Sequence, residues 1–510
     1  MEAIYGIDLG TSNCLTARVL KVFDDIEVHS LIDKNGNDSF ASVVHFVEED
    51  EVIVGDRAKL LLPEYPDRTV EYVKLRLGKE KTIQINTENG YKYITPQEVT
   101  ALLLRHFNVL HQNQIKTAVL TVPAHIDENQ KSAVLEAGKL AGIEIIDIFE
   151  EPSAAVMYHL FNQYKSQGNI QLRPGEYRNY LVFDFGGGTL DLSIIKVELD
   201  EDGNAKPSVI AKDGDSTLGG NVIDNELTRW FLEELKIEYG DTFIREALVH
   251  FNFFIENKYF RSDIDPNMKQ FLLRLKNTAE YVKVQLSSQE EQLVEVGRLE
   301  YKNFTIERSD FEEEILEPIF KFRVIKALET LKSKNTNDEV IDEVLLVGGT
   351  SQIPYFEKLI ATFFEELADR ITIIDEYRLA VAKGAAILGA IASGIYVPPF
   401  GNNLVYNTVS HNIFVNNTLL IERGLPYPFK YPKIARFQIK HALQTSILIK
   451  IFEEYEVFDR VKQNRVNQRR MIKKIKFYHP FFYRGETITI HLQIDHYGLL
   501  SFKAIHDDTN

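Results

Sequence analysis

The sequence predicts an α/β fold of two related halves that enclose one phosphate-binding site, followed by an all-β domain. Two glycine-bearing loops, at residues 8–11 and 184–189, each follow an apolar strand and begin with an aspartate. A third loop, with a glycine pair at 348–349, follows another apolar run. After residue 394 the alternation of strand and helix patterns stops and β-forming residues dominate.

The first two loops have the composition of a phosphate cradle. IYGIDLGTSN ends at Asn13, and YLVFDFGGGTLDLSII runs from Tyr180 to Ile195. Such a turn directs several backbone N–H groups at one point, and glycine is needed because a Cβ would keep an anion away. Asp8 and Asp184 would repel phosphate, so we expect them to face a hydrated cation or an attacking water. Two copies about 175 residues apart indicate two halves that bind one nucleotide.

The third element is EVLLVGGTSQIPYFEKLI, from Glu343 to Ile360. Val344 to Val347 predicts a buried strand, the glycine pair a turn, and Pro354 the start of a helix. A strand with an Asp–Gly loop, a second such loop and a Gly–Gly loop form the pattern of the actin-like ATPases. The sequence has neither a Walker-A motif nor a GxGxxG fingerprint, which argues against P-loop and dinucleotide-binding proteins.

Eight segments make the chain similar to the seventy-kilodalton heat-shock chaperone family, the DnaK type in bacteria. In chain order they are IDLGTSN, AVLTVPAHIDENQ, AGIEIIDIFEEPSAAV, VFDFGGGTLDLSI, GDSTLGGNVID, AEYVKVQLSS, LLVGGTSQIP and AVAKGAAILGAI. They follow the family's order and spacing over roughly residues 3–394, and the VPA and EEPSAA elements separate this family from actins and sugar kinases. The resemblance implies a two-lobed, actin-like ATPase with ribonuclease-H-like subdomains, followed by an all-β sandwich.

Length and composition agree with a multidomain protein of a reducing compartment. A chain of 510 residues with 44% apolar residues suggests three or four compact units. A single cysteine, Cys14, excludes a disulfide framework, and packing is its favoured role. The N-terminus has no basic region, so we expect no signal peptide. The stretch LAVAKGAAILGAIASGIYV contains Lys383 and predicts a packed helix rather than a membrane span. We therefore expect a cytoplasmic protein that does not enter membranes.

Charge is distributed unevenly along the chain. From Gly401 to the end there are 16 Lys+Arg and 9 Asp+Glu, a net charge of +7. The whole-chain totals of 58 and 75 leave 42 basic and 66 acidic residues, a net charge of −24, for residues 1–400. The acidic half disfavours nucleic acid as a partner, although the basic run Arg460–Lys476 raises that alternative. Because this run lacks interleaved aromatic residues, a solvated loop or strand rim is the favoured interpretation.

The path through the first part alternates strands and helices, as an α/β fold requires. Residues 225–290 are mostly helical, which matches the extra subdomain that the resemblance implies over one side of the cleft. The other predicted elements are a hairpin from Val43–Phe46 and Glu51–Val54, a helix over Thr95–His111, a strand over Ala118–Val122, a helix over Glu128–Ala141 and a strand over Glu144–Phe149.

The domain boundaries predicted are an ATPase domain over 1–394, a linker over 395–403 and a β-sandwich domain over 404–510. The alternation of Ile488 to Ile494 predicts a half-buried strand, and 495–498 its hairpin turn. The linker IYVPPFGNN replaces the family's leucine-rich acidic linker, so we expect weaker coupling between the domains. We also expect a shortened member without the helical lid, and hence rapid peptide release.

The resemblance assigns the reaction to a group of residues in the cleft. Lys74 falls on the family's catalytic lysine, and Glu151 on the carboxylate that senses the cation and the water. Asp8 and Asp184 would hold the waters of Mg²⁺, and Thr189 with Asp191 would place K⁺ ions or the attacking water. The predicted phosphate loops contain Gly10, Thr11, Ser12, Asn13, Gly186, Gly187, Gly188, Gly219, Gly220, Gly348, Gly349 and Thr350.

The nucleoside side departs from the family pattern. Glu280, Lys283 and Ser287 lie at i, i+3 and i+7, on one helix face that can reach a ribose and base. Val284 stands where a stacking arginine is expected. Gln352 stands at another arginine position, and Arg378 replaces an aspartate. These changes put the affinity and the base selectivity of the site in question.

Three function classes follow. The first is an ATP-hydrolysing chaperone that binds extended apolar peptides, with J-domain and nucleotide-exchange co-chaperones as partners. The second is a nucleotide-dependent regulatory protein with little chaperone activity, and the third is a carbohydrate kinase, which the VPA and EEPSAA elements disfavour. Pro123 matches the family's switch proline, but an ordinary strand terminator explains it equally well.

Overall fold

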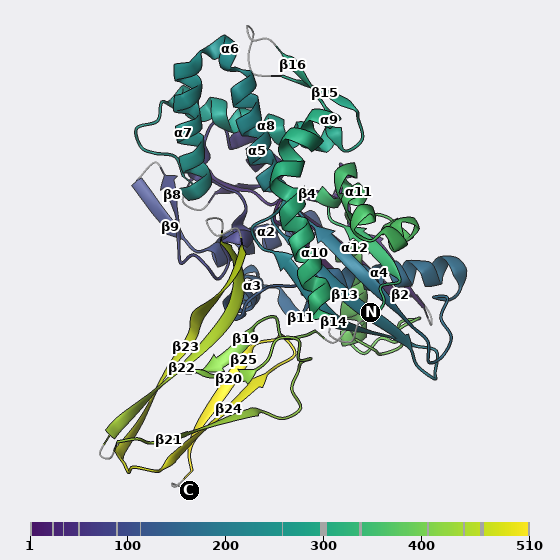
Figure 1. Cartoon of the computed structure of the whole chain (residues 1–510), viewed down its shortest axis with the longest axis vertical. Helices are drawn as coiled ribbons and strands as arrows, with labels where there is room; N and C mark the ends of the chain where they lie inside the picture. Colours follow the sequence, from purple (N-terminus) through teal and green to yellow (C-terminus); the bar gives the residue numbers. More distant parts are fainter. Residues whose placement is uncertain are drawn as a thin grey trace.

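A computed structural model describes residues 3–22, 25–33, 35–48, 51–87, 90–112, 114–257, 259–295, 303–335, 339–404, 407–441, 444–459 and 464–507. The α/β part consists of two lobes (Figure 1), and each lobe contains a mixed sheet, of six strands in lobe I and five in lobe II; five strands of each sheet form the same path. Within each sheet the strands follow the order 3-2-1-4-5, since lobe I reads β3-β2-β1-β10-β11 and lobe II β14-β13-β12-β17-β18. The first three strands are antiparallel and the last two parallel in both sheets. This repeated topology is the two-lobed architecture that the sequence predicts.

The strand bounds show how each sheet presents an aspartate at the same place. β1 and β12 are the central strands and carry Asp8 and Asp184 near their C-terminal ends. The strands of lobe I are β1 Ile4–Leu9, β2 Asn13–Val22, β3 Asp25–Ser30, β10 Thr117–Val122 and β11 Glu144–Glu150, with β4 Ser39–Ala41 beside β2. Those of lobe II are β12 Tyr177–Phe185, β13 Leu190–Leu199, β14 Ala205–Asp215, β17 Glu343–Val347 and β18 Ile371–Ile373.

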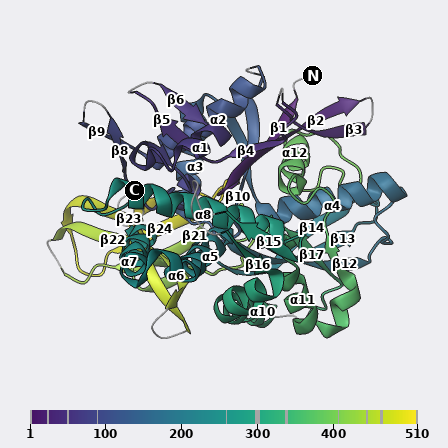
Figure 2. The same ribbon diagram turned by 90° about the horizontal axis from the view of Figure 1, so that it is seen from above.

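Two helices lie between the sheets. Helix α12 (Ala380–Ala392) packs on the lobe I sheet and contacts α4 (Glu151–Gln167), which packs on the lobe II sheet; Figure 2 shows both between the lobes. Glycine allows this close approach, because a Cβ on Gly384 would lie 1.8 Å from the carbonyl oxygen of Ala154. The apolar stretch around Lys383 is therefore a packed helix, as predicted. No helix in the described part of the chain is long and apolar enough to cross a membrane.

The remaining elements of the ATPase part surround the two sheets. Lobe I contributes β5 Val44–Phe46, β6 Val52–Val54, α1 Asp56–Leu61, η1 Pro66–Arg68, β7 Thr69–Val70, η2 Val73–Leu75, β8 Ile83–Thr87, β9 Gly90–Ile94, α2 Pro96–Leu110 and α3 Glu128–Ala141. Lobe II contributes α5 Gly220–Glu234, α6 Lys236–Tyr239, α7 Asp241–Asn257, α8 Pro266–Leu286, β15 Glu291–Val294, β16 Phe304–Glu307, α9 Arg308–Asp310, η3 Phe311–Lys321 (a π-helix), α10 Phe322–Lys334, η4 Thr350–Gln352, α11 Pro354–Phe363 and η5 Glu365–Arg370.

The C-terminal part is a β-sandwich, as predicted. A four-stranded sheet in the order β20-β19-β22-β23 packs on a three-stranded sheet β21-β24-β25 around a shared apolar core. The bounds are β19 Asn412–Val415, β20 Thr418–Ile421, β21 Lys433–Gln438, β22 Gln444–Asp459, β23 Asn464–Phe482, β24 Thr487–Ile494 and β25 Leu500–His506. The predicted alternation in β24 is present, since Ile488, Ile490, Leu492 and Ile494 are buried.

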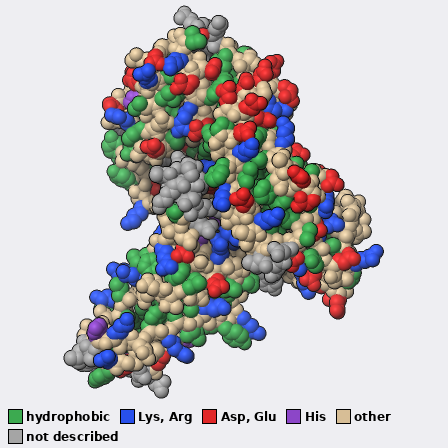
Figure 3. Space-filling model, in the orientation of Figure 1, with side chains coloured by type: hydrophobic (Ala, Val, Ile, Leu, Met, Phe, Trp, Pro, Cys, Tyr) green, Lys and Arg blue, Asp and Glu red, His purple; other side chains and the backbone are tan. Residues whose placement is uncertain are grey.

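The basic run lies mainly on a strand. Residues 460–463 are outside the described residues, and the rest belongs to β23, the edge strand of its sheet. Lys474 and Lys476 are exposed there, and Lys450 of β22 lies directly opposite Lys474. Figure 3 shows acidic side chains gathered on the ATPase lobes and basic ones on the β-domain.

The β-domain docks on lobe I through polar contacts (Figure 1). Arg470 of β23 forms an ion pair of 2.5 Å with Asp127, the N-cap of α3. The Glu128 carboxylate accepts a 2.7 Å hydrogen bond from the backbone N–H of Leu500, and Lys131 donates to the hydroxyl of Tyr427 at 3.2 Å. The segment before the domain packs as well, since Val397 and Phe400 are fully buried in the core of the ATPase part.

Candidate active site

Four carboxyl groups converge where the two lobes meet. Asp8 ends β1 and accepts a long hydrogen bond, 3.4 Å, from Thr121 of β10. Asp184 on β12 lies opposite Asp191 on β13 in the antiparallel register, and both are buried. Glu151 is the first residue of α4 and is also buried. The fold therefore brings together Asp8 and Asp184, which the sequence predicts to face a cation, and Glu151, the predicted sensing carboxylate.

Lys74 supplies a cation to this group. It lies in the 3-10 turn η2, whose preceding residue, Tyr72, adopts a left-handed conformation with φ of 54°. The ammonium of Lys74 donates a 2.5 Å hydrogen bond to Glu151. Burial alone would lower the pKa of Lys74, but the carboxylates of Glu151 and Asp8 outweigh it and hold the pKa above its ordinary value. Lys74 is thus a buried, charged group at the place where a phosphate would carry negative charge.

The carboxyl groups outnumber this single ammonium. Burial and the neighbouring carboxylate of Glu151 raise the pKa of Asp8 to about 7 and that of Asp191 to about 7. The same two causes raise the pKa of Asp184 well above its ordinary value. Such a site fits a hydrated divalent cation, which would restore the charge balance. In the described residues no group of three or more His, Cys, Asp or Glu side chains is placed to hold a metal ion directly.

These shifted pKa values predict a pH dependence of stability. The folded protein keeps protons on Asp8 and Asp191 up to about pH 7, whereas the unfolded chain releases them near pH 4, so unfolding free energy falls as pH rises through that window. Each such carboxyl contributes up to ~1.4 kcal/mol per pH unit to this fall in unfolding free energy. Asp191→Asn removes one of them, so between about pH 5 and about pH 8 we expect the thermal midpoint of the nucleotide-free variant to drop less than that of the unchanged protein. Identical slopes for the two proteins would contradict the assignment.

The phosphate loops lie against each other across the cleft. A Cβ on Gly187 would lie 2.2 Å from the Ser12 hydroxyl oxygen, and one on Gly188 would lie 2.6 Å from that of Thr11. The Gly220 N–H and the Thr350 hydroxyl both donate to the carbonyl oxygen of Gly186, at 3.0 and 2.9 Å. Only glycine permits this approach, because any side chain would separate the loops. Lobe I and lobe II therefore present their loops to one shared space.

The remaining loop glycines surround that space. A Cβ on Gly10 would lie 2.0 Å from the carbonyl oxygen of Asn13, so the first loop is a tight turn. A Cβ on Gly219 would lie 2.4 Å from the carbonyl carbon of Gly188. Gly348 has φ of +82°, and its Cβ would lie 2.8 Å from a carboxylate oxygen of Asp184. Its neighbour Gly349 is open, with nothing within 4 Å of such a Cβ.

The predicted nucleoside residues are engaged with other side chains. Glu280 on α8 pairs with Lys59 of α1 at 2.7 Å, across the cleft. Lys283 pairs with the buried Asp224 at 2.6 Å and donates to the carbonyl oxygen of Gly220 at 3.3 Å. The Ser287 hydroxyl donates within its own helix. Glu280 and Lys283 border the loops, and Val284 is 56% exposed on the same helix.

The other two departures from the family pattern, Arg378 and Gln352, contact different residues. Arg378 donates a 2.8 Å hydrogen bond to the Ser39 hydroxyl of lobe I and lies 3.9 Å from Asp38. Gln352 contacts its neighbour Ser351 at 3.4 Å. The structure therefore gives Arg378 a partner between the lobes, which its position in the sequence alone does not predict.

Sequence reasoning missed a buried polar group behind the carboxylates. The Ala124 N–H donates to Asp191, and the Ala124 carbonyl oxygen accepts from the Ser410 hydroxyl at 3.1 Å. Lys212 donates to Glu150 at 2.7 Å, to the carbonyl oxygen of Thr408 at 2.8 Å and to Ser410 at 3.1 Å. The segment that leads into the β-domain is thus hydrogen-bonded directly to the backbone that supports Asp191, and Lys212 connects it to Glu150, the residue before Glu151.

The sequence matches a known family model along nearly the whole chain, and known proteins over most of it. The family model described as "Hsp70 protein" matches residues 4–250 and 240–510. "Chaperone protein DnaK" of Mycoplasmopsis agalactiae is 33% identical over 406 residues, which cover 77% of this chain and 59% of that relative. The protein of that name from Thermotoga neapolitana is 31% identical over 405 residues, with 77% and 60% covered.

A further relative extends the match into the β-domain. "Chaperone protein DnaK" of Thermosipho melanesiensis is 30% identical over 471 residues, which cover 89% of this chain and 70% of that protein. The chain spans about 60% of the length of the first relatives named above. The family match and the repeated sheet topology agree, and the chain belongs to the Hsp70 family.

Proposed function

We propose that the chain binds ATP and hydrolyses it slowly to ADP and phosphate, as a nucleotide-regulated chaperone of the DnaK type. The convergence of Lys74, Glu151, the buried Asp184 and Asp191, and the partly buried Asp8 beneath facing phosphate loops carries this proposal. Phosphoryl transfer needs charge neutralisation and a positioned water more than a strong base, and these residues can supply both.

The residues present fit a nucleotide-bound magnesium ion. Asp8 and Asp184 would hold it through its waters, and its charge would offset the burial of their carboxylates. Thr189 and Asp191 would position the attacking water or a potassium ion, because the Thr189 hydroxyl and the Ala124 N–H both donate to Asp191 and fix its orientation. Lys74, held by Glu151, would face the γ-phosphate.

The β-domain would bind extended, unfolded apolar polypeptides. Tyr427, Phe429 and Phe482 fill its core, whereas Tyr431 and Tyr483 are 71% and 62% exposed; the Phe481 side chain lies outside the described residues. Tyr431 precedes β21 and Tyr483 follows β23, and such exposed aromatic side chains at strand ends suit the side chains of an extended apolar segment. J-domain and nucleotide-exchange proteins of the cytoplasm are the partners that we propose for this activity.

The test measures ATP binding by the ATPase domain and its effect on peptide binding by the β-domain. Calorimetry should show ATP binding in the presence of Mg²⁺, and a labelled apolar peptide should bind more weakly when ATP is present than when ADP is present. Given the altered linker, we expect the peptide Kd to shift by less than ~100-fold, a coupling below ~3 kcal/mol. If the protein binds ATP but its peptide Kd is the same with ATP and with ADP, the chain is a nucleotide-dependent protein without chaperone regulation.

Ion pairs across the cleft predict the rate of nucleotide exchange. Three ion pairs join lobe I to α8, and we call them the front clasp. They are Lys59–Glu280 at 2.7 Å, Asp67–Lys269 at 2.6 Å and Glu71–Lys276 at 3.2 Å. Replacing Lys59 and Lys269 together by glutamine should speed release of a fluorescent ADP by about two- to tenfold, because partly exposed pairs contribute ~0.2–1 kcal/mol each. Arg274→Gln, which removes only a 3.9 Å contact with Glu64, is the matched control. An unchanged release rate in the double variant would show that the clasp does not limit exchange.

A further inference from the structure

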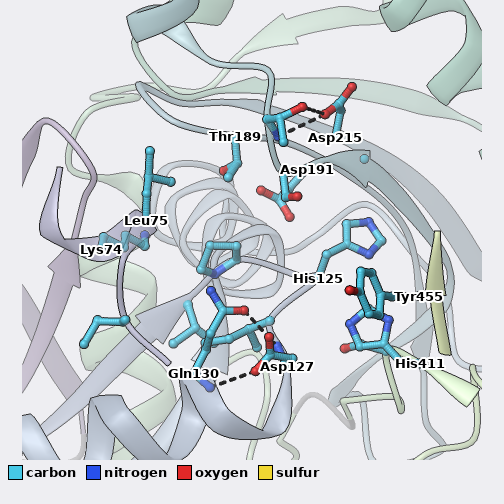
Figure 4. A pocket seen from close by; sticks show the side chains of 18 of the residues that line it. Lys74, Leu75, His125, Asp127, Gln130, Thr189, Asp191, Asp215, His411 and Tyr455 are labelled. Atoms are coloured by element: carbon cyan, nitrogen blue, oxygen red, sulfur yellow. Dashed lines mark hydrogen bonds between the residues drawn. The ribbon is translucent and has the colours of Figure 1, made fainter. Parts of the chain in front are cut away.

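One cavity of about 390 Å³ extends from Asp191 in the catalytic centre to the β-domain (Figure 4). Its inner end is lined by Thr11, Lys74, Thr189 and Asp191. Its outer end is lined by residues of all three bodies: Asp127 and Gln130 of lobe I, Asp215 to Thr217 of lobe II, and His411, Arg423, Tyr455 and Arg470 of the β-domain. We call it the rear cavity, because it reaches the β-domain, which lies at the opposite end of the molecule from α8 and the front clasp (Figure 1).

The front and the rear of the nucleotide cleft are closed by different elements. At the front, the three clasp pairs bind lobe I to α8 over the nucleotide loops. At the rear, the closing elements are side chains of the β-domain, of which the Arg470 guanidinium reaches Asp127 at 2.5 Å and Glu453 at 3.5 Å. A phosphate released between Thr189 and Asp191 would lie at the inner end of the rear cavity. The nucleotide loops would separate it from the front.

The lining suits a small anion in transit. Arg423 and Arg470 are cations at the outer end, and the chain segment at His125 lies close to Gly214, where a Cβ would be 2.9 Å from the imidazole. Burial and the nearby histidine and lysine lower the pKa of His411 well below its ordinary value, so this imidazole is neutral and offers no fixed charge that would trap phosphate. At the inner end the lining includes Lys74, which supplies a cation there.

We infer that inorganic phosphate leaves the catalytic centre through the rear cavity while the front clasp retains ADP, and that the β-domain gates this exit. The inference rests on the proposed ATPase function. Phosphate release and ADP release would then be controlled separately, by different domains and at opposite ends of the cleft.

Two exposed serines allow each end to be blocked in turn. Ser216 lines the rear cavity, and Ser262 lines the groove beside the Asp67–Lys269 pair at the front. The native thiol of Cys14 is buried, so a bulky maleimide would label Ser216→Cys or Ser262→Cys selectively. Each labelled, ADP-loaded protein is mixed with beryllium fluoride, a phosphate analogue, and its capture is followed by ¹⁹F NMR.

We expect the label at Ser216→Cys to slow capture by at least ~10-fold, equivalent to ~1.4 kcal/mol of barrier, while the label at Ser262→Cys leaves the rate unchanged. Arg470→Gln, which loosens the rear closure, should speed capture. Capture slowed only by the front label, or by neither label, would overturn the inference. Calorimetry with ADP on the unlabelled protein separates the two ideas, since a failure to bind ADP would refute the proposed ATPase itself.

Discussion

Replacing Lys74 by alanine is expected to lower ATP hydrolysis by ~10²–10³-fold while changing ATP affinity little. The Lys74 side chain is only 11% exposed and is held by Glu151, so its ammonium is preorganised to neutralise charge that develops on the transferring phosphoryl group. A group that acts mainly in the transition state affects turnover more than ground-state binding. Single-turnover hydrolysis and calorimetric affinity, measured on the same preparation, give the two quantities.

Lys81→Ala is the matched control, because Lys81 is an exposed lysine close in sequence. Glu151→Gln should weaken turnover as well, since it removes the acceptor that orients Lys74. Equal losses of affinity and turnover in Lys74→Ala would mean that Lys74 only supports the fold of η2.

Replacing Lys212 by methionine is expected to be the most destabilising single change described here. The Lys212 and Glu150 side chains are 3% and 1% exposed, and they lie at the junction of lobe I, lobe II and the segment entering the β-domain. Removing one partner leaves a buried carboxylate without its cation, which costs ~3–5 kcal/mol. Denaturant unfolding of the whole chain should show the loss.

The double variant Lys212→Met with Glu150→Gln tests the cause. Because it removes both charges, it should recover much of the lost stability. The single variant should also weaken docking of the β-domain, which limited proteolysis of the segment around Thr408 can follow. A double variant as unstable as the single one would place the effect in packing rather than in the ion pair.

Local patterns predicted the elements well where caps and turns mark their ends. Helix α3 has the predicted bounds because Asp127 and Gln130 form a capping box and Gly142 ends the helix in a left-handed conformation. β24 was predicted because its alternation matches one buried face. The two aspartate loops were found because a strand, an acid and a glycine are adjacent in sequence.

The contacts that join distant segments were not predicted. Lys212, Glu150 and Ser410 meet only after three parts of the chain fold together, and none of them carries a local signal. The ion pair of Glu150 with Lys212 anchors the residue that precedes Glu151. Arg378 is similar, because its partner Ser39 lies 339 positions away. The domain limits and the roles of the site residues remain predictions.

The charged side chains near the edge strand β23 affect how the β-domain associates with other chains in crowded solution. An unpaired strand edge is a template for the addition of another chain, and this edge strand spans Asn464–Phe482. This strand carries the exposed Lys474 and Lys476, and Lys450 on the neighbouring strand β22 lies opposite Lys474. None of the three has an ion-pair partner in the described part of the chain. A second copy brought edge to edge would meet its own charges. The sheet therefore resists aggregation, which a protein proposed to work among unfolded, strand-forming polypeptides would need.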